Sequence, residues 1–281
     1  MNNDNRLDII VVNYGTSDVV IYFGFEDGRF YKGKSCSTGT GSGPVSLAIG
    51  DFNNDNRSDF VIANSLTDEI GVFLGYGSEI FGGLGRYDLD FGSKPYAVAI
   101  GDFDNDGNPD IAIATYGANN IVIKQGNGYG QFNDMSTYST GVGSAPCSIA
   151  IGDFNNDNNS DIVVANCETN NLSILLGYGN GSFVIKATYS TGDRSHPSTV
   201  VTADFNNDNI MDIAVANFGT NNIFLLYGYG NGSFGNKELY QLGYNYRPYT
   251  IAVNDLNQDG WMDIVVGCYG TDDVEILMQM C

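Results

Sequence analysis

An acidic nine-residue pattern recurs along this chain at a constant spacing and limits the folds that are open to it. The fullest copy runs from Asp102 to Asp110, with Asp at positions 1, 3, 5 and 9 and Gly107 at position 6. Four further full copies lie 51 residues apart without any insertion, and they open at Asp51, Asp153, Asp204 and Asp255. A fixed internal period of this size indicates a repeat fold, in which each unit needs its neighbours to bury its faces.

The chemistry of the pattern indicates a bound cation, because carboxylates packed this densely repel one another. Ca²⁺ takes about six to eight oxygen ligands from carboxylates, amides and backbone carbonyls. Position 6 is Gly or Asn, the residue types that best tolerate the left-handed region. The pattern is not an EF-hand, because it lacks the Glu at position 12 and leads into a β-like run at Ile111. We predict a strand–loop–strand calcium site; the alternative is a set of Asx-rich turns without metal.

The predicted ligands occupy positions 1, 3, 5, 7 and 9, with position 7 acting through its backbone carbonyl. In the five full loops they are Asp51, Asn53, Asp55, Arg57, Asp59, Asp102, Asp104, Asp106, Asn108, Asp110, Asp153, Asn155, Asp157, Asn159, Asp161, Asp204, Asn206, Asp208, Ile210, Asp212, Asp255, Asn257, Asp259, Trp261 and Asp263. A truncated copy at the start of the chain adds Asn2, Asp4 and Asp8. Five bound Ca²⁺ would change the formal net charge from −21 to about −11.

The composition agrees with an all-β protein and excludes some partners. The 281 residues include 37 Gly but only 6 Pro, with 18 Tyr and 16 Phe, which suits many strands and turns. A net charge of −21 argues against nucleic acid and against an anionic membrane surface as partners. No apolar stretch is long enough for a membrane helix, so we expect no membrane insertion.

Each unit contains four short β-like runs, which in the second unit are residues 45–49, 60–63, 70–74 and 87–91. The first two are almost continuously apolar, as in strands covered on both faces, and the last is polar. This gradient fits a four-stranded β-propeller blade. We predict one all-β propeller domain over residues 1–281, with units of about 1–50, 51–101, 102–152, 153–203, 204–254 and 255–281.

The two ends of the chain leave the number of blades open. The first unit lacks its first strand and the last unit lacks its fourth. We predict six blades with incomplete first and last members; seven blades, completed by sequence outside this chain or by a partner chain, are the alternative. Open strand edges also allow strand exchange or oligomer formation.

The repeats resemble a known family. Residues 50–55 read GDFNND, residues 59–64 read DFVIAN and residues 175–183 read LLGYGNGSF, with equivalents in the other units. These motifs resemble FG-GAP (VCBS-type) repeats, as in the N-terminal propeller of integrin α subunits, over essentially the whole chain. The resemblance implies calcium loops, an extracellular or cell-surface location, and a role in adhesion or ligand binding. Integrin propellers have seven blades, whereas this chain carries motifs for six.

Two cysteines stand opposite each other in the fourth unit. Cys147 and Cys167 flank the loop 153–161 symmetrically, so they should face each other across the hairpin. Other units place Tyr96 opposite Tyr116 and Tyr249 opposite Tyr269. We predict a Cys147–Cys167 disulfide in an oxidising compartment; the alternative is two buried thiols.

Basic and aromatic residues gather in the connections expected at the rim opposite the calcium loops. They are Lys94, Arg194, His196 and Arg247 between units, and Tyr14, Tyr116, Phe218 and Tyr269 in the turns after the second strands. Variable loops on a rigid scaffold often carry function. Our hypothesis is that this rim binds an anionic or carbohydrate-bearing partner; ordinary solvated loop charges are the alternative.

Catalysis has little support in the sequence. There is no G-x-S-x-G motif and no glycine-rich phosphate loop, and the chain has one His. The paired carboxylates have the spacing of calcium ligands rather than of an acid–base pair. We therefore expect a non-enzymatic module that binds a protein or glycan ligand or mediates adhesion. The alternatives are a lectin-like carbohydrate binder and, third, a carbohydrate-active propeller enzyme.

Overall fold

The computed structural model describes residues 1–2, 4–77 and 80–279. It is an all-β, six-bladed propeller of small antiparallel sheets, and no described residue lies in a helix. Accordingly, the described part of the chain offers no helix that could cross a membrane. The chain divides into two compact units, one of residues 1–102 and 106–138 and the other of residues 103–105 and 139–281. The assignment of residues 1–281 to a single domain stays a prediction.

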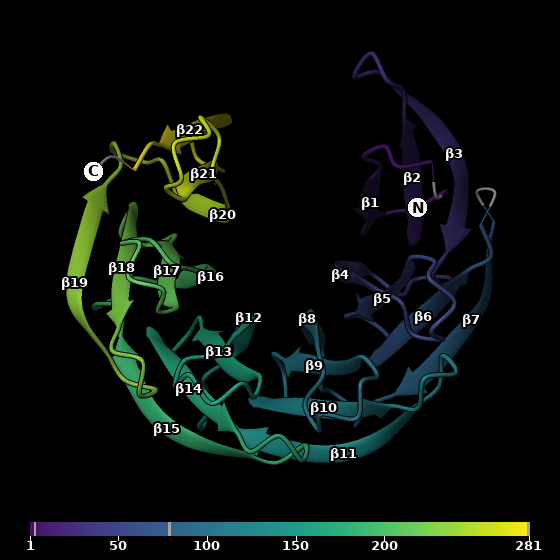
Figure 1. Ribbon diagram of the computed structural model, residues 1–281, viewed down its shortest axis with the longest axis horizontal. Helices are drawn as coiled ribbons and strands as arrows, with labels where there is room; N and C mark the ends of the chain where they lie inside the picture. Colours follow the sequence, from purple (N-terminus) through teal and green to yellow (C-terminus); the bar gives the residue numbers. More distant parts are fainter. Residues whose placement is uncertain (3, 78–79, 280–281) are drawn as a thin grey trace. The chain divides into compact units, whose positions relative to one another are not determined.

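The first unit contains three sheets, in which consecutive strands are neighbours (Figure 1). The strands are β1 (Ile9–Asn13), β2 (Asp18–Gly24) and β3 (Phe30–Ser37); β4 (Pro44–Gly50), β5 (Asp59–Asn64), β6 (Glu69–Gly75) and β7 (Phe81–Asp88); and β8 (Pro95–Gly101), β9 (Asp110–Thr115), β10 (Asn120–Gly126) and β11 (Phe132–Ser139). The first sheet has three strands in the described residues, as predicted for the incomplete first blade.

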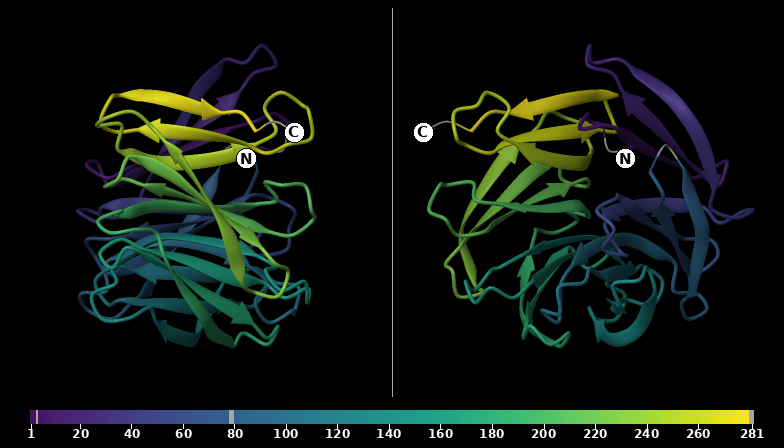
Figure 2. Two further views of the ribbon diagram at one scale, coloured as in Figure 1. Left: turned by 90° about the vertical axis from the view of Figure 1, so that its left-hand side faces the viewer. Right: turned by 45° about the vertical axis from the view of Figure 1, so that its right-hand side comes forward.

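The second unit also contains three sheets. The strands are β12 (Pro146–Gly152), β13 (Asp161–Asn166), β14 (Asn171–Gly177) and β15 (Phe183–Ser190); β16 (Pro197–Ala203), β17 (Asp212–Asn217), β18 (Asn222–Gly228) and β19 (Phe234–Gln241); and β20 (Pro248–Asn254), β21 (Asp263–Cys268) and β22 (Asp273–Leu277). The sheet of β20 to β22 has three strands side by side (Figure 2). Six sheets with incomplete terminal members therefore confirm the predicted blade number.

The burial of the strands explains most of the sequence pattern. In each four-stranded sheet the second strand is buried at every residue, as in β5, because it pairs on both edges and is covered on both faces. The first strand is mostly half-buried, so the expectation of two covered faces was wrong for it. It lies at the edge of its sheet and pairs on one side only.

The predicted position of the fourth strand was also wrong. In the second unit it spans Phe81–Asp88 rather than residues 87–91. Its register with β6 passes through an irregularity, with Leu74 opposite Gly82 and Ile70 opposite Tyr87. Phe91, which we placed in the strand, is fully exposed in the connection to β8. The prediction failed because the turn after Gly75 is shorter than its glycine content suggested.

Phenylalanine at position 2 of the acidic loops joins neighbouring sheets within each unit. Phe52 packs edge-on against Phe132 with ring centroids 5.3 Å apart, and Phe154 packs against Phe234 at 5.4 Å. Phe52 and Phe154 are each 1% exposed. The loop backbone is tied to the same neighbour, because the N–H of Gly232 donates to the carbonyl of Phe154 at 2.8 Å. The loops are therefore anchored in the apolar core and hold their acidic side chains at a fixed place.

Candidate functional site

The five segments 51–59, 102–110, 153–161, 204–212 and 255–263, here called the acidic loops, share one set of hydrogen bonds. In the first, Asp51 accepts from the N–H groups of Asp55 at 3.1 Å and Asn56 at 2.7 Å. The Asp at position 1 makes the same two bonds in the other four loops. Positions 4 and 6 adopt positive φ, with values of 56° at Asn54 and 60° at Asn56. The repeated Asn and Gly therefore allow the left-handed backbone conformation that the turn of the loop requires.

The carboxylates of the loop 102–110 converge. Asp102, Asp104 and Asp106 each offer an oxygen, and these oxygens lie within 4.8 Å of one another. Calcium–oxygen distances are about 2.3–2.6 Å, so two ligands on opposite sides of one ion can be about 5 Å apart. The spacing therefore fits a single cation. The other acidic loops carry Asn at position 3 and so present two of these three carboxylates.

Asn53 provides an independent sign of a missing ligand in the loop 51–59. Its amide N–H₂ donates to Asp55 at 3.1 Å. Its Oδ1 is buried and has no hydrogen-bond partner among the described residues. A buried polar oxygen without a partner is costly, and a cation would satisfy it. The residues at positions 1, 3 and 5 therefore fit Ca²⁺, which these oxygens would hold.

The Asp at position 9 has a structural role that the sequence did not reveal. Asp59 is fully buried and accepts from the N–H groups of Phe52 at 2.8 Å and Gly75 at 2.6 Å. Asp161, Asp212 and Asp263 make the same pair of bonds to the start of the loop and to the residue at or just after the end of the third strand. Burial raises the pKa of Asp59, and it raises the pKa of Asp161 and Asp212 to about 6. These carboxylates therefore brace the hairpin, and metal ligation at position 9 stays a prediction.

Position 7 also differs from a simple ligand position. The N–H of this residue donates to the Asp at position 5, at 2.8–3.0 Å, in Arg57, Asn108, Asn159, Ile210 and Trp261. In two loops the side chain at position 7 also links the loop to its neighbour within a unit. Asn108 accepts a hydrogen bond from Asn54 at 2.9 Å, and Asn159 accepts one from Asn105 at 2.8 Å. In the last pair of loops Asn207 donates to the carbonyl of Gly260 at 3.2 Å. We refer to these three contacts as the asparagine bridges.

The truncated copy at the start of the chain partly reproduces the loop. Asn2 donates to Asp4 at 3.1 Å, and Asp4 accepts from the N–H of Arg6 at 3.0 Å. Asp8 accepts from the N–H of Gly24 at 2.9 Å, as the other position 9 residues do with their third strands. Its second oxygen pairs with the ammonium group of Met1 at 2.8 Å.

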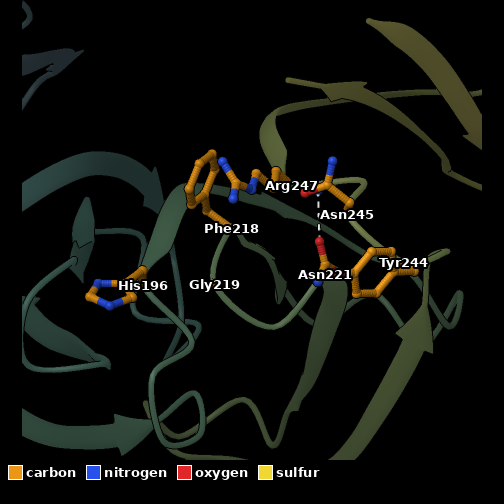
Figure 3. Close-up of a pocket in the computed structure, with 7 residues that line it drawn as sticks. All are labelled: His196, Phe218, Gly219, Asn221, Tyr244, Asn245 and Arg247. Atoms are coloured by element: carbon orange, nitrogen blue, oxygen red, sulfur yellow. Dashed lines mark hydrogen bonds between the residues drawn. The ribbon is translucent and has the colours of Figure 1, made fainter. Parts of the chain in front are cut away.

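Three of the predicted rim residues line one pocket of about 340 Å³ in the second unit. His196 and Arg247 come from the connections before β16 and β20, and Phe218 from the turn after β17. Figure 3 shows His196 on one side and Tyr244 on the other, with Gly219 between them. The turn holds the connection that carries Arg247, because Asn221 accepts from the Arg247 N–H at 2.9 Å. The Arg247 guanidinium lies over the Phe218 ring, 5.7 Å from its centroid.

The remaining rim residues do not line this pocket. Lys94 and Tyr116 are joined in the first unit, where the Tyr116 N–H donates to the Lys94 carbonyl at 3.1 Å. Tyr14 is exposed in the turn after β1. Arg194 lies in the same connection as His196, and Tyr269 contacts Phe218 with ring centroids 6.2 Å apart. Within the second unit three rim residues therefore line the pocket, within the first unit Lys94 and Tyr116 are joined, and a role of the rim in binding stays a prediction.

The structure contains a disulfide between Cys147 of β12 and Cys167, which follows β13. The two Cα atoms are 6.1 Å apart. In another blade the same slot holds Tyr96 and Tyr116, whose ring centroids are 5.6 Å apart. Cys36 and Cys268 are free.

The family of the chain follows from its repeats. A model of the FG-GAP-like repeat matches residues 1–62, 51–113, 102–164, 153–215 and 206–266, which together cover most of the chain. The chain belongs to the FG-GAP-like repeat family. The matched segments contain all five acidic loops of this FG-GAP-like protein, and a search of curated proteins found no match.

Solved structures with a similar fold include enzymes. A virginiamycin B lyase from Staphylococcus aureus is 15% identical, with 99% of this chain and 83% of that chain covered and a TM-score of 0.67. A periplasmic gluconolactonase from Pseudomonas aeruginosa is 13% identical, with 100% and 72% covered and a TM-score of 0.68. A protein from Lactobacillus plantarum is 12% identical, with 98% and 81% covered and a TM-score of 0.74. At these identities the similarity concerns the fold.

These comparisons correct our expectation that the FG-GAP-like protein is not an enzyme. That expectation rested on missing hydrolase and phosphate-loop motifs and on a single His. The similar structures include a lyase and a gluconolactonase, so this propeller architecture is one that enzymes use. The prediction was wrong because motifs from other folds say little about catalysis on a propeller, where function depends on the local site.

The sequence did not single out Asn221, Tyr244 and Asn245, which also line the pocket. Comparison of the 51-residue units could have found Tyr244, since the equivalent positions hold Thr40, Phe91, Val142 and Asp193. Asn221 gave no such signal, because the equivalent Asn170 makes the same capping bond to the N–H of His196, at 2.9 Å.

Proposed function

We propose that this FG-GAP-like propeller binds calcium in its acidic loops and recognises a protein or glycan ligand with anionic groups through its rim. The single observation that carries the calcium proposal is the convergence of three carboxylate oxygens within 4.8 Å in the loop 102–110. The orphaned Oδ1 of Asn53 supports it in a second loop. Calcium would supply positive charge between carboxylates that otherwise repel one another, and would hold each hairpin tip in one conformation.

The location that we propose is extracellular or at the cell surface. The Cys147–Cys167 disulfide supports it, because disulfides persist mainly in oxidising compartments. Calcium is abundant there, and extracellular modules often bind it with dissociation constants of about 10⁻⁴ to 10⁻³ M. At roughly tenfold excess over such a constant, each filled loop stabilises the folded state by about 1.4 kcal/mol.

A calorimetric calcium titration tests the metal sites. We expect about five ions per chain, and about four for the double variant Asp102→Asn with Asp106→Asn. The control is Asp88→Asn with Asp90→Asn, which removes the same charge from two exposed positions outside the loops. An unchanged stoichiometry in the loop variant, or an equal loss in the control, contradicts the assignment.

A second candidate function is catalysis at the same pocket. It is favoured by the similar folds of a lyase and a gluconolactonase, and by His196, the single His of the chain, which lines the pocket. A histidine is the side chain best suited to general acid–base work near neutral pH. Turnover of a cyclic ester or a glycan that is lost in His196→Ala supports this candidate. Binding without turnover in both proteins leaves recognition as the function.

A further inference from the structure

Arg247 stands out among the arginines of this acidic protein. Four of the six arginines pair with carboxylates, Arg6, Arg29, Arg57 and Arg86. Arg194 and Arg247 have no such ion pair among the described residues. On a chain with a formal charge of −21, an arginine without an acidic partner is available to bind an anionic ligand.

The fold holds Arg247 in a prepared position. Its backbone has a positive φ of 48°, an uncommon conformation for a residue other than glycine. The bond from its N–H to Asn221 maintains this geometry, and the guanidinium lies over the Phe218 ring. A guanidinium over an aromatic ring can still offer N–H groups to the two oxygens of a carboxylate. Less side-chain entropy is then lost when an anion binds.

An aromatic surface adjoins the arginine. Phe218, Tyr249 and Tyr269 form a triangle with ring centroids 6.2–6.4 Å apart. Tyr249 is 50% exposed and Tyr269 is 67% exposed, and Tyr244 at the far side of the pocket is almost fully exposed. Exposed apolar clusters of this kind mark binding surfaces. The negative ring faces attract the C–H groups of a pyranose, whose own faces are apolar.

Gly219, which lines the pocket, allows the turn after β17 to pack closely against the connection before β16. A Cβ at this position would lie 2.1 Å from the Arg194 carbonyl oxygen and 3.0 Å from the His196 ring, so a side chain does not fit without a shift of the backbone. The walls carry the polar groups of Asn221, Asn245 and His196 (Figure 3). A volume of about 340 Å³ is at the lower end for ligand pockets and suits one or two sugar rings.

We propose that this pocket binds a sugar that carries a carboxylate. The carboxylate would bind Arg247, and an apolar face of the sugar would pack on the aromatic surface of Phe218, Tyr249 and Tyr269, which meets the pocket at Phe218. The proposal rests on the proposed role of the rim in ligand recognition. A plain inorganic anion would use the arginine but not the aromatic surface, and a neutral sugar would use the aromatic surface but not the arginine. A carboxylated sugar uses both.

Titrations observed by ligand NMR, with galacturonate, glucuronate, galactose and sulfate as probes, test this proposal. We expect at least one uronate to bind at least tenfold more tightly than galactose and than sulfate. Arg247→Gln should weaken that uronate at least tenfold and leave galactose unchanged, whereas Tyr249→Ala should weaken both sugars. A parallel titration with oligogalacturonate shows whether the pocket prefers the terminal sugar of a glycan or a free monosaccharide, because the two affinities can be compared directly.

The matched control is Lys94→Gln, because Lys94 occupies the slot of Arg247 in another repeat but does not line the pocket. It should leave uronate binding unchanged. Equal affinities for uronate and galactose, equal affinities for uronate and sulfate, or full binding by Arg247→Gln each overturn the proposal. The acidic loops and the pocket share no residue, so calcium binding by Arg247→Gln reports separately on the proposed function.

Discussion

The disulfide between Cys147 and Cys167 allows a quantitative prediction of stability. It closes a segment with a sequence separation of 20 residues, which includes the acidic loop 153–161. In the chain-entropy model, a closed loop of this size lowers the entropy of the unfolded chain by about 11 cal/mol/K, or about 3 kcal/mol at 25 °C. For a chain of this length, 3 kcal/mol corresponds to a shift of roughly 6 °C in the midpoint of thermal unfolding.

Differential scanning calorimetry in saturating calcium, with and without a reducing agent, measures this effect. We expect the midpoint to fall by roughly 6 °C on reduction. The double variant Cys147→Ala with Cys167→Ala should show at least the same loss and no further response to the reductant. Cys36→Ser, which changes a free cysteine, is the control and should behave as the parent protein. A midpoint that does not move on reduction refutes the entropic argument.

Three further predictions concern the acidic loops and their support. Without calcium, burial raises the pKa of Asp161 and Asp212 to about 6 in the folded state, above the ordinary Asp value of 3.8. The stability that these two groups contribute should therefore be complete below about pH 4 and be lost as the pH rises through about 6. Chelated protein melted across this range should show that trend and saturating calcium should flatten it; a chelated midpoint that falls steadily on acidification contradicts it. Phe154→Ala should cost about 3–5 kcal/mol in denaturant unfolding, because the ring is 1% exposed and packs on Phe234, whereas Phe91→Ala at a fully exposed position should cost almost nothing. Terbium luminescence excited through the single Trp261 should disappear in Asp259→Asn and persist in Asp106→Asn, since Trp261 lies in the loop of Asp259; equal losses would refute separate sites.

Much of the fold could be predicted from the sequence, because a fixed period repeats each local signal. The acidic loops and the apolar second strands, such as Asp59–Asn64, are contiguous in the chain and depend on local stereochemistry. The fourth strand of the second unit was misplaced because its glycine-rich start was assigned to the turn after Gly75, and because its register depends on pairing with β6, which residues 81–91 do not reveal on their own.

The candidate sites were predictable to different extents. The ligands at positions 1, 3 and 5 follow from spacing within one loop, and the structure brings them together in the loop 102–110. The bracing role of Asp59 involves Gly75, 16 residues away, and could not be seen from the loop alone. The pocket combines a turn and two connections from different repeats, so the sequence indicated His196, Phe218 and Arg247 one by one but not that they line one pocket within the second unit.

The asparagine bridges have a consequence for how the metal sites fill. Each bridge reaches from one loop to position 7 or, at Gly260, position 6 of the next, so an ion that orders one loop also restrains its neighbour. Ile210, at position 7 of its loop, cannot accept such a bond with its side chain. We expect calcium to bind cooperatively to loops that an asparagine bridge connects, and without such cooperativity between the loops of Asn156 and Ile210. A calcium isotherm steeper than that of independent sites, which becomes shallower when Asn54 is replaced by Ala, would reveal such communication between hairpin tips.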